Sequence, residues 1–248
     1  MNALLKLTWL EIKIFAREPM GLFGTVGIPV LVFLVASNLA GPRIAQAAAR
    51  PGGVVSAFLP VLASIMMALS AISSLVTIVS IYREGGILKR LRATPLSPTV
   101  ILSAHVIVKL LFTVLTLAIM VLAGRRYLPP AVSVPLVSYG VALTFSTWAI
   151  LSIGFLIASL VPTARFAQPL AALILYPMLA LSGLFFPIDS LPSSLQMVAR
   201  ALPLGYAVSL LDGIWRGEGW VAHLDDVSAL VVFFVVFTAI ARRFFRWE

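Results

Sequence analysis

Apolar residues run through this sequence in long charge-free stretches, separated by short segments that hold most of the charges. Most stretches reach the roughly 20 residues that an α-helix needs to cross a bilayer. The last one is shorter, and we expect the arginines at its end to complete the span by extending toward the membrane surface. The pattern therefore predicts six membrane-spanning helices, at about 21–40, 56–82, 100–123, 134–161, 167–186 and 225–243.

Two shorter apolar stretches, 191–199 and 201–211, lie between the fifth and sixth predicted spans. Each is too short to cross a membrane, and Arg200 separates them. We therefore expect the segment 189–211 to form two re-entrant or interfacial half-helices. An ordinary loop with two amphipathic turns is the alternative. The prolines that punctuate this segment are Pro187, Pro192 and Pro203.

Residues 1–18 have the pattern of an amphipathic helix that ends before Pro19. At 100° per residue, Lys6, Lys13 and Arg17 fall within about 40° of one another on the helix surface. We predict a helix that lies in the membrane interface, with this basic stripe facing lipid headgroups or a partner protein. A simple membrane anchor and a partner contact both remain open at this point.

The composition agrees with a membrane protein. Of the 248 residues, 61% are hydrophobic and 11% are charged, and the mean hydropathy is +1.08. Soluble domains carry about 25% charged residues, so this chain has too few charges to cover a soluble surface. We predict an all-α integral membrane protein, with 1–248 forming a single transmembrane domain in the lipid bilayer. Because there is no cysteine, disulfides and thiolate chemistry are excluded.

The net charge of +9 reflects basic residues at the ends of apolar runs, where no aromatic side chains accompany them for base stacking. Nucleic acid is therefore not an expected partner. If the N-terminus lies inside, most Lys and Arg fall on the inner side, as the positive-inside rule requires. Arg125 and Arg126 run against this bias without reversing it. We expect a multi-pass protein with both termini in the cytoplasm and the segment 189–211 outside.

The predicted cytoplasmic loop 83–98 has a pattern of its own. Its apolar residues have helical spacing, and its basic residues occupy other faces. A glycine pair permits a bend after the second span, and Thr94–Pro95 ends the short helix. Such a helix suits docking in a groove of a soluble partner; a positively charged cap on spans two and three is the alternative. The residues of interest in this loop, to which the resemblance described below assigns a coupling role, are Arg83, Glu84, Gly86, Leu88, Arg90, Leu91, Arg92, Thr94 and Pro95.

Few other residues are candidates for chemistry. Lys109 is the one charge well inside a predicted span, where it serves either function or a buried structural role. His105 and His223 have no carboxylates at the spacing of metal ligands, so we expect polar interfacial residues. The chain shows no paired catalytic carboxylates and no Ser/His/Asp set. No catalytic residue and no metal site is predicted.

The loop 83–98 resembles the coupling loop of ABC-2 export-type permeases, whose pattern is approximately RE.G.L..LR.TPLS. The segments 182–192 and 202–206 resemble the signature that precedes the last span in this family. The interfacial N-terminal helix and the six-span plan agree with the resemblance, which covers nearly the whole chain. It implies a gate at the outer end of the transport path, with candidate residues Gly183, Phe185, Phe186, Pro187, Pro192, Pro203 and Tyr206.

The resemblance further implies the membrane subunit of an ATP-driven exporter in a prokaryotic plasma membrane. No lysine follows a glycine, so the chain has no P-loop, and it is not expected to be an enzyme. A separate ABC ATPase subunit, in two copies, would bind ATP and Mg²⁺, while this chain would form a homodimer without a cofactor of its own. The implied mechanism is alternating access, and the apolar spans suit a hydrophobic or amphipathic substrate such as a drug, a lipid or a lipid-linked glycan.

Three alternatives belong to other classes. An ion-coupled secondary transporter would use intramembrane carboxylates, and no predicted span has one near its centre. A membrane enzyme would need a catalytic set that is missing from the sequence. A non-transporting membrane assembly subunit is compatible with every feature of the sequence.

Overall fold

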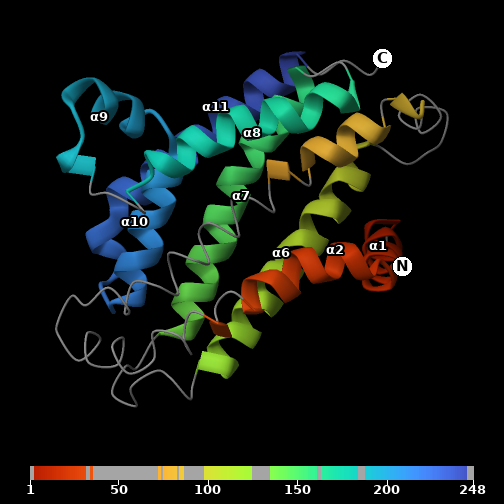
Figure 1. The fold of residues 1–248 in the computed structure, drawn as a ribbon, viewed down its shortest axis with the longest axis horizontal. Helices are drawn as coiled ribbons and strands as arrows, with labels where there is room; N and C mark the ends of the chain where they lie inside the picture. The colour runs from red at the N-terminus through yellow and green to blue at the C-terminus, as the bar shows by residue number, and fades with distance from the viewer. Residues whose placement is uncertain are drawn as a thin grey trace.

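The computed structural model describes residues 3–31, 34–35, 72–73, 75–82, 84–86, 98–124, 135–160, 163–183 and 188–244. Within these ranges every regular element is helical, as the predicted all-α class requires (Figure 1). Helical backbone also covers 28–31 and 75–82. The named elements are α1 (Ala3–Arg17), α2 (Pro19–Leu22), the π-helical turn η1 (Phe23–Gly27), α6 (Pro98–Gly124), α7 (Leu136–Leu160), α8 (Ala164–Ala180), η2 (Ile188–Ser190), α9 (Ser193–Arg200), α10 (Pro203–Trp215), η3 (Trp220–His223) and α11 (Leu224–Phe244).

Three of the described helices are long and apolar enough to cross a membrane, over Ser103–Met120, Val137–Leu160 and Trp220–Arg243. The first two lie in α6 and α7, and the third covers η3 and most of α11. They correspond to the third, fourth and sixth predicted spans. Of the first predicted span, residues 21–31 and 34–35 are described, and they are helical. Most of the second predicted span, 56–82, lies outside the described residues. The described part of the chain therefore accounts for three spans, or four if the bent pair α9 and α10 forms one span.

The fifth predicted span, 167–186, is longer than the helix that forms there. α8 has 17 residues and ends at Ala180, which corresponds to about 26 Å of helix against a hydrocarbon core of about 30 Å. A turn follows, and Gly183 adopts a φ of 84°, in the left-handed region that terminates helices. The charge-free run continues beyond this turn, so the absence of charge overestimated the length of the helix.

The two predicted half-helices form as α9 and α10, which meet at an angle of 79°. Pro192 precedes α9, and Pro203 is the first residue of α10, where its missing N–H is not needed. α10 continues to Trp215, beyond the predicted end at 211. The charged residue Asp212 does not end the helix, because its carboxylate pairs with Arg216 one turn later and so stabilises the additional turn.

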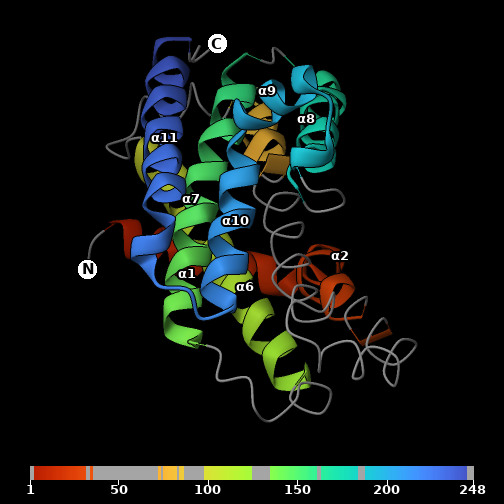
Figure 2. The same ribbon diagram turned by 90° about the vertical axis from the view of Figure 1, so that its left-hand side faces the viewer.

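The core lies around α7, with α10 and α11 side by side against it (Figure 2). Tyr139, Ile150 and Ile157 of α7 are fully buried. The ring of Tyr139 meets Trp215 of α10 edge-on, with 5.2 Å between ring centroids, a favoured aromatic geometry. In contrast, α11 exposes a row of valines on its outer side. A helix with one apolar face buried and another exposed suits a lipid environment.

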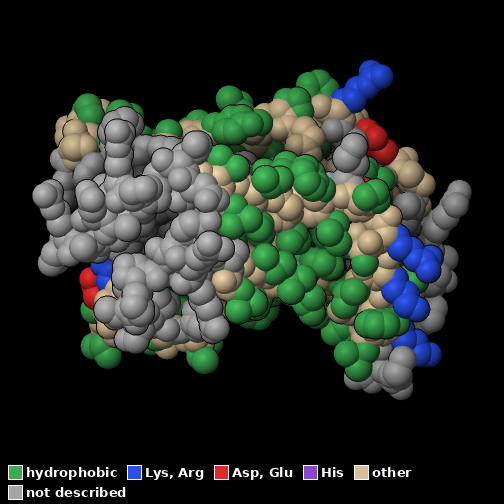
Figure 3. Space-filling model, turned by 60° about the horizontal axis from the view of Figure 1, so that its bottom comes forward, with side chains coloured by type: hydrophobic (Ala, Val, Ile, Leu, Met, Phe, Trp, Pro, Cys, Tyr) green, Lys and Arg blue, Asp and Glu red, His purple; other side chains and the backbone are tan. Residues whose placement is uncertain are grey.

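The two ends of the helix bundle differ in charge. The chain termini lie at one end, and α9 and α10 lie at the other (Figure 1). Lys and Arg side chains gather at the end with the termini, whereas hydrophobic side chains cover the middle (Figure 3). We call these the basic end and the α10 end. The acidic residues Asp212, Glu218 and Asp226 all belong to the α10–α11 region.

Candidate functional site

At the basic end, α1 packs against the first half of α6 through aromatic and apolar contacts. The rings of Phe15 on α1 and Phe112 on α6 lie 4.5 Å apart between centroids. Lys109, one turn before Phe112, places its ammonium 4.6 Å from the centroid of the Phe15 ring, a cation–π distance. Only 9% of Lys109 is exposed. The charge that the sequence placed inside a span is thus covered by the N-terminal helix.

A polar contact reinforces this junction. Nδ1 of His105 on α6 lies 3.4 Å from Oε2 of Glu11 on α1, although Nδ1 has no well-formed hydrogen bond. The approach of His105 lowers the pKa of the Glu11 carboxyl below its usual value, against the opposing effect of burial. The nearby hydroxyl of Tyr82 also lowers the pKa of this carboxyl. Glu11 therefore joins three segments: α1, the helix 75–82 and α6. We call this set of contacts the α1–α6 junction.

The basic stripe of α1 faces away from the junction. Lys6, Lys13 and Arg17 are all exposed, and the ammonium of Lys13 lies 5.5 Å from the ring centroid of Trp9. Several apolar residues of α1 are also more than half exposed: Leu5, Trp9, Leu10 and Ile14. A helix that exposes both basic and apolar side chains is suited to a membrane interface, so the predicted interfacial role remains a prediction that the geometry permits.

The candidate coupling loop is described only at its beginning. Helical backbone runs over 75–82, Glu84 is helical and exposed, and a turn follows in which Gly86 has a φ of 63°. Because L-residues rarely adopt this conformation, a glycine suits this position. The predicted bend between spans two and three stays a prediction, since the chain after Gly86 lies outside the described residues. The remaining coupling candidates lie outside the described residues: Arg83, Leu88, Arg90, Leu91, Arg92, Thr94 and Pro95.

The candidate gate residues gather where α8 ends and α9 and α10 begin. A Cβ on Gly183 would lie 3.5 Å from Ile188, and a Cβ on Gly205 would lie 3.6 Å from the same side chain, so both glycines lie beside Ile188 with room for ordinary contact. The Tyr206 hydroxyl donates to the carbonyl of Arg200 at 2.9 Å, which ties α10 to α9. Phe185, Phe186 and Pro187 lie outside the described residues. The described part of the motif holds the bend together; its role as a gate is a prediction.

A second polar cluster, which the sequence reading did not assemble, fastens α10 to α11. His223 places Nδ1 2.8 Å from Oδ2 of Asp226 and Nε2 3.0 Å from Oε2 of Glu218. Ser209 of α10 donates to the same Asp226 oxygen at 2.8 Å. A Cβ on Gly213 would lie only 1.8 Å from Nε2 of His223, so the imidazole rests directly on the α10 backbone. We call this group the His223 cluster.

The His223 cluster could have been predicted from the sequence, whereas the contact between Glu11 and His105 could not. Glu218 and Asp226 stand five residues before and three residues after His223, and the latter is the spacing of helical neighbours. That local signal could have located the His223 cluster. Glu11 and His105 share no local pattern, because only the fold brings α1 onto α6.

This arrangement defines a class: a helical membrane protein with an N-terminal helix docked at its basic end and a bent helix pair at the other. Residues 2–214 match the family model described as ABC-2 type transporter. The chain therefore belongs to the ABC-2 type transporter family, as the resemblance of its loop and its second motif predicted.

Individual relatives agree. The chain is 35% identical over 107 residues to Nodulation protein J of Rhizobium leguminosarum bv. trifolii, a match that covers 42% of this chain and 40% of the relative. It is 31% identical over 169 residues to the inner membrane transport permease YhhJ of Escherichia coli, which covers 66% of this chain and 44% of the relative. The matches thus span less than half the length of these curated relatives.

Proposed function

We propose that this chain is the membrane-spanning permease subunit of an ATP-driven ABC exporter. A separate ABC ATPase subunit, present in two copies, binds ATP and Mg²⁺, and two copies of this chain form a homodimer. The protein lies in a plasma membrane with both termini in the cytoplasm. The charge difference between the two ends of the bundle supports this orientation, since Lys and Arg prefer the cytoplasmic side.

The observation that carries the proposal is the α1–α6 junction. Glu11 contacts Tyr82 and His105, and these residues stand at the two borders of the segment that holds the candidate coupling loop. A movement of that loop therefore reaches α1 and α6 together. ATP-driven closure of the partner subunits would enter the membrane domain through this junction, and the α9–α10 bend would open or close the outer end in an alternating-access cycle.

The substrate is proposed to be hydrophobic or amphipathic, such as a drug, a lipid or a lipid-linked glycan. The windows Ser103–Met120 and Val137–Leu160 hold no carboxylate, and the third window, Trp220–Arg243, holds Asp225 and Asp226 only near its beginning, in the first turn of α11. The lack of a central carboxylate in these windows supports this choice over an ion-coupled transporter, which would need one. A non-transporting assembly subunit would co-purify with a partner but would not change its ATP hydrolysis when an amphipathic compound is added, so an ATPase assay with and without the compound separates it from an exporter.

The test is purification of the tagged chain from its native membrane in mild detergent, followed by an ATPase assay. We expect a co-purifying P-loop subunit, and we expect the double variant Leu88→Asp/Leu91→Asp to lose that subunit or at least about 90% of its ATPase activity, because two charges are placed on the docking face. The matched control is Val221→Asp, since Val221 is 81% exposed at the α10 end. The absence of an ATPase partner under every solubilisation condition would overturn the proposal.

A further inference from the structure

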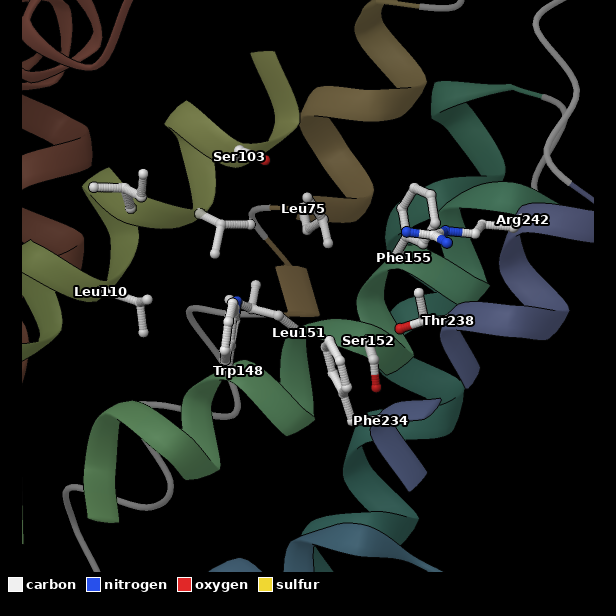
Figure 4. Close-up of a pocket in the computed structure, with 12 residues that line it drawn as sticks. Leu75, Ser103, Leu110, Trp148, Leu151, Ser152, Phe155, Phe234, Thr238 and Arg242 are labelled. Atoms are coloured by element: carbon white, nitrogen blue, oxygen red, sulfur yellow. The ribbon is translucent and has the colours of Figure 1, made fainter. Parts of the chain in front are cut away.

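A pocket of about 460 Å³ opens near the basic end, between α6, α7, α11 and the helix 75–82 (Figure 4). This volume falls in the range of small-molecule sites, about 300–1,000 Å³. Its walls are apolar over most of their area, with Leu75, Leu110 and Phe155 among the lining residues. Trp148, also in the lining, is 54% exposed. The pocket is therefore open on the outer surface of the bundle, where a membrane would supply acyl chains.

The polar side of the pocket comes from α11. Phe234, Thr238 and Arg242 are spaced four residues apart, so they form one stripe along the helix, and Figure 4 shows all three projecting into the pocket. Arg242 lies in the last turn of α11, at the level where a charged side chain reaches lipid headgroups. Among the described residues that line the pocket there is no Asp or Glu. An apolar cavity with the guanidinium of Arg242 at its mouth is complementary to an anion with a hydrocarbon tail.

We propose that this pocket binds an anionic phospholipid of the surrounding bilayer, with an acyl chain between α6, α7 and α11 and the phosphate on the Arg242 guanidinium. Basic pockets between membrane helices bind anionic headgroups in this way, and the planar guanidinium donates to two phosphate oxygens at once. The adjacent Arg243 lies about 100° around the helix and does not line the pocket. The neighbouring arginines are therefore assigned different roles: Arg242 binds the lipid, and Arg243 contributes only general positive charge.

This inference rests on the membrane placement of the chain and not on its coupling to an ATPase. The purified full chain would be equilibrated in detergent with equal amounts of phosphatidylglycerol and phosphatidylcholine, and retained lipid would be measured by native mass spectrometry. We expect one tightly held phosphatidylglycerol. Arg242→Gln should reduce its retention about tenfold, the loss expected for one charged hydrogen-bonding partner, whereas Arg243→Gln should retain it. Equal loss in both variants, or no lipid preference in the unmodified chain, would overturn the proposal.

A second measurement covers the case in which Arg242→Gln disturbs folding. Trp148 lines the pocket and, with the other four tryptophans replaced by Phe, reports a lipid beside it. Brominated phosphatidylglycerol should quench its fluorescence more strongly than brominated phosphatidylcholine. Thr238→Phe fills the pocket without adding a second tryptophan. This variant should abolish the difference between the two lipids. Quenching by both lipids to the same extent in the parent chain would exclude a specific anionic site.

The same variants and lipids distinguish a resident lipid from two other possible occupants of the pocket: a second copy of this chain and a lipid that is transported. If a second copy of this chain covers the pocket, Trp148 is shielded from both lipids, and the shielding disappears on dilution to monomers. If the lipid is transported cargo, then ATP added to the complex with its ATPase should release phosphatidylglycerol from Arg242, whereas a resident bilayer lipid stays bound. Either result contradicts a resident lipid without touching the proposed exporter function, whose test is co-purification of the ATPase.

Discussion

The two histidines of the chain lie in different polar groups, and the contrast between them is instructive. His223 has a carboxylate oxygen at each ring nitrogen, at 2.8 and 3.0 Å, and both partners are close to it in sequence. His105 lies 3.4 Å from the carboxylate of Glu11, which belongs to α1, a helix far from His105 in the sequence. The α10 end is thus fastened by short local contacts, whereas at the basic end the apolar packing of Phe15 on Phe112 is accompanied by the longer contact between Glu11 and His105. A contact that must change during a transport cycle is better served by the second kind.

The largest effect is expected from a substitution at the His223 cluster. In Gly213→Ala the new Cβ would overlap the His223 ring, whose three nearest atoms lie at 1.8, 2.3 and 2.8 Å. Because the ring is held by Glu218 and Asp226, it cannot move without losing those contacts. We expect a loss of about 2–3 kcal/mol in the free energy of unfolding, measured by thermal or denaturant unfolding in detergent.

The matched control is Gly140→Ala, because Gly140 is also helical and a Cβ there has no neighbour within 4 Å. In an unobstructed helix position, alanine should leave stability unchanged or raise it by up to about 1 kcal/mol. If both variants behave alike, the His223 ring does not rest on α10 in the folded protein and the comparison fails at its tight end.

A smaller effect is expected at the loose side. Phe15→Ala removes the ring that packs on Phe112 and covers Lys109, which should weaken the docking of α1 by about 1–2 kcal/mol. Since the chain has no cysteine, the double variant Glu11→Cys/His105→Cys gives a direct readout of docking through disulfide formation. We expect Phe15→Ala to lower the cross-linking yield.

Phe23→Ala is the control, because Phe23 is also near the N-terminus and is half exposed. It should leave the yield unchanged. A yield that falls equally in both variants would show that the loss of any nearby aromatic ring loosens this region. The specific role of Phe15 in the junction would then be wrong.

The sequence predicted the features that depend on neighbouring residues and missed those that depend on how distant helices pack. The boundaries of α7 and α11 follow from charge-free runs that charges or prolines delimit, and the prolines located the bend between α9 and α10. The end of α8 was missed because the chain turns over residues 181–183, where Gly183 has a positive φ, without any change in polarity. The contacts of Glu11 and Lys109 with their partners were missed for another reason: they depend on how α1 lies across α6, and neither residue carries a local signal of that packing.

The smallest expected effect is a pH dependence of the α1–α6 junction. His105 lowers the pKa of Glu11 below its ordinary value of 4.5, so the charged carboxylate is favoured in the folded state. A group with a lowered pKa contributes stability that is present above its unfolded pKa and is lost as the pH falls through the folded pKa. The parent chain should therefore exceed Glu11→Gln in stability by about 0.5–1 kcal/mol at pH 7, and the difference should shrink only below about pH 4.5.

Unfolding at a series of pH values from 7 to about 3.5 measures this difference in stability, with Asp225→Asn at the α10 end as the control. A difference between parent and Glu11→Gln that stays constant across this range would mean that the Glu11 charge does not hold α1 on α6, and the junction would then depend on Phe15 and its apolar neighbours alone.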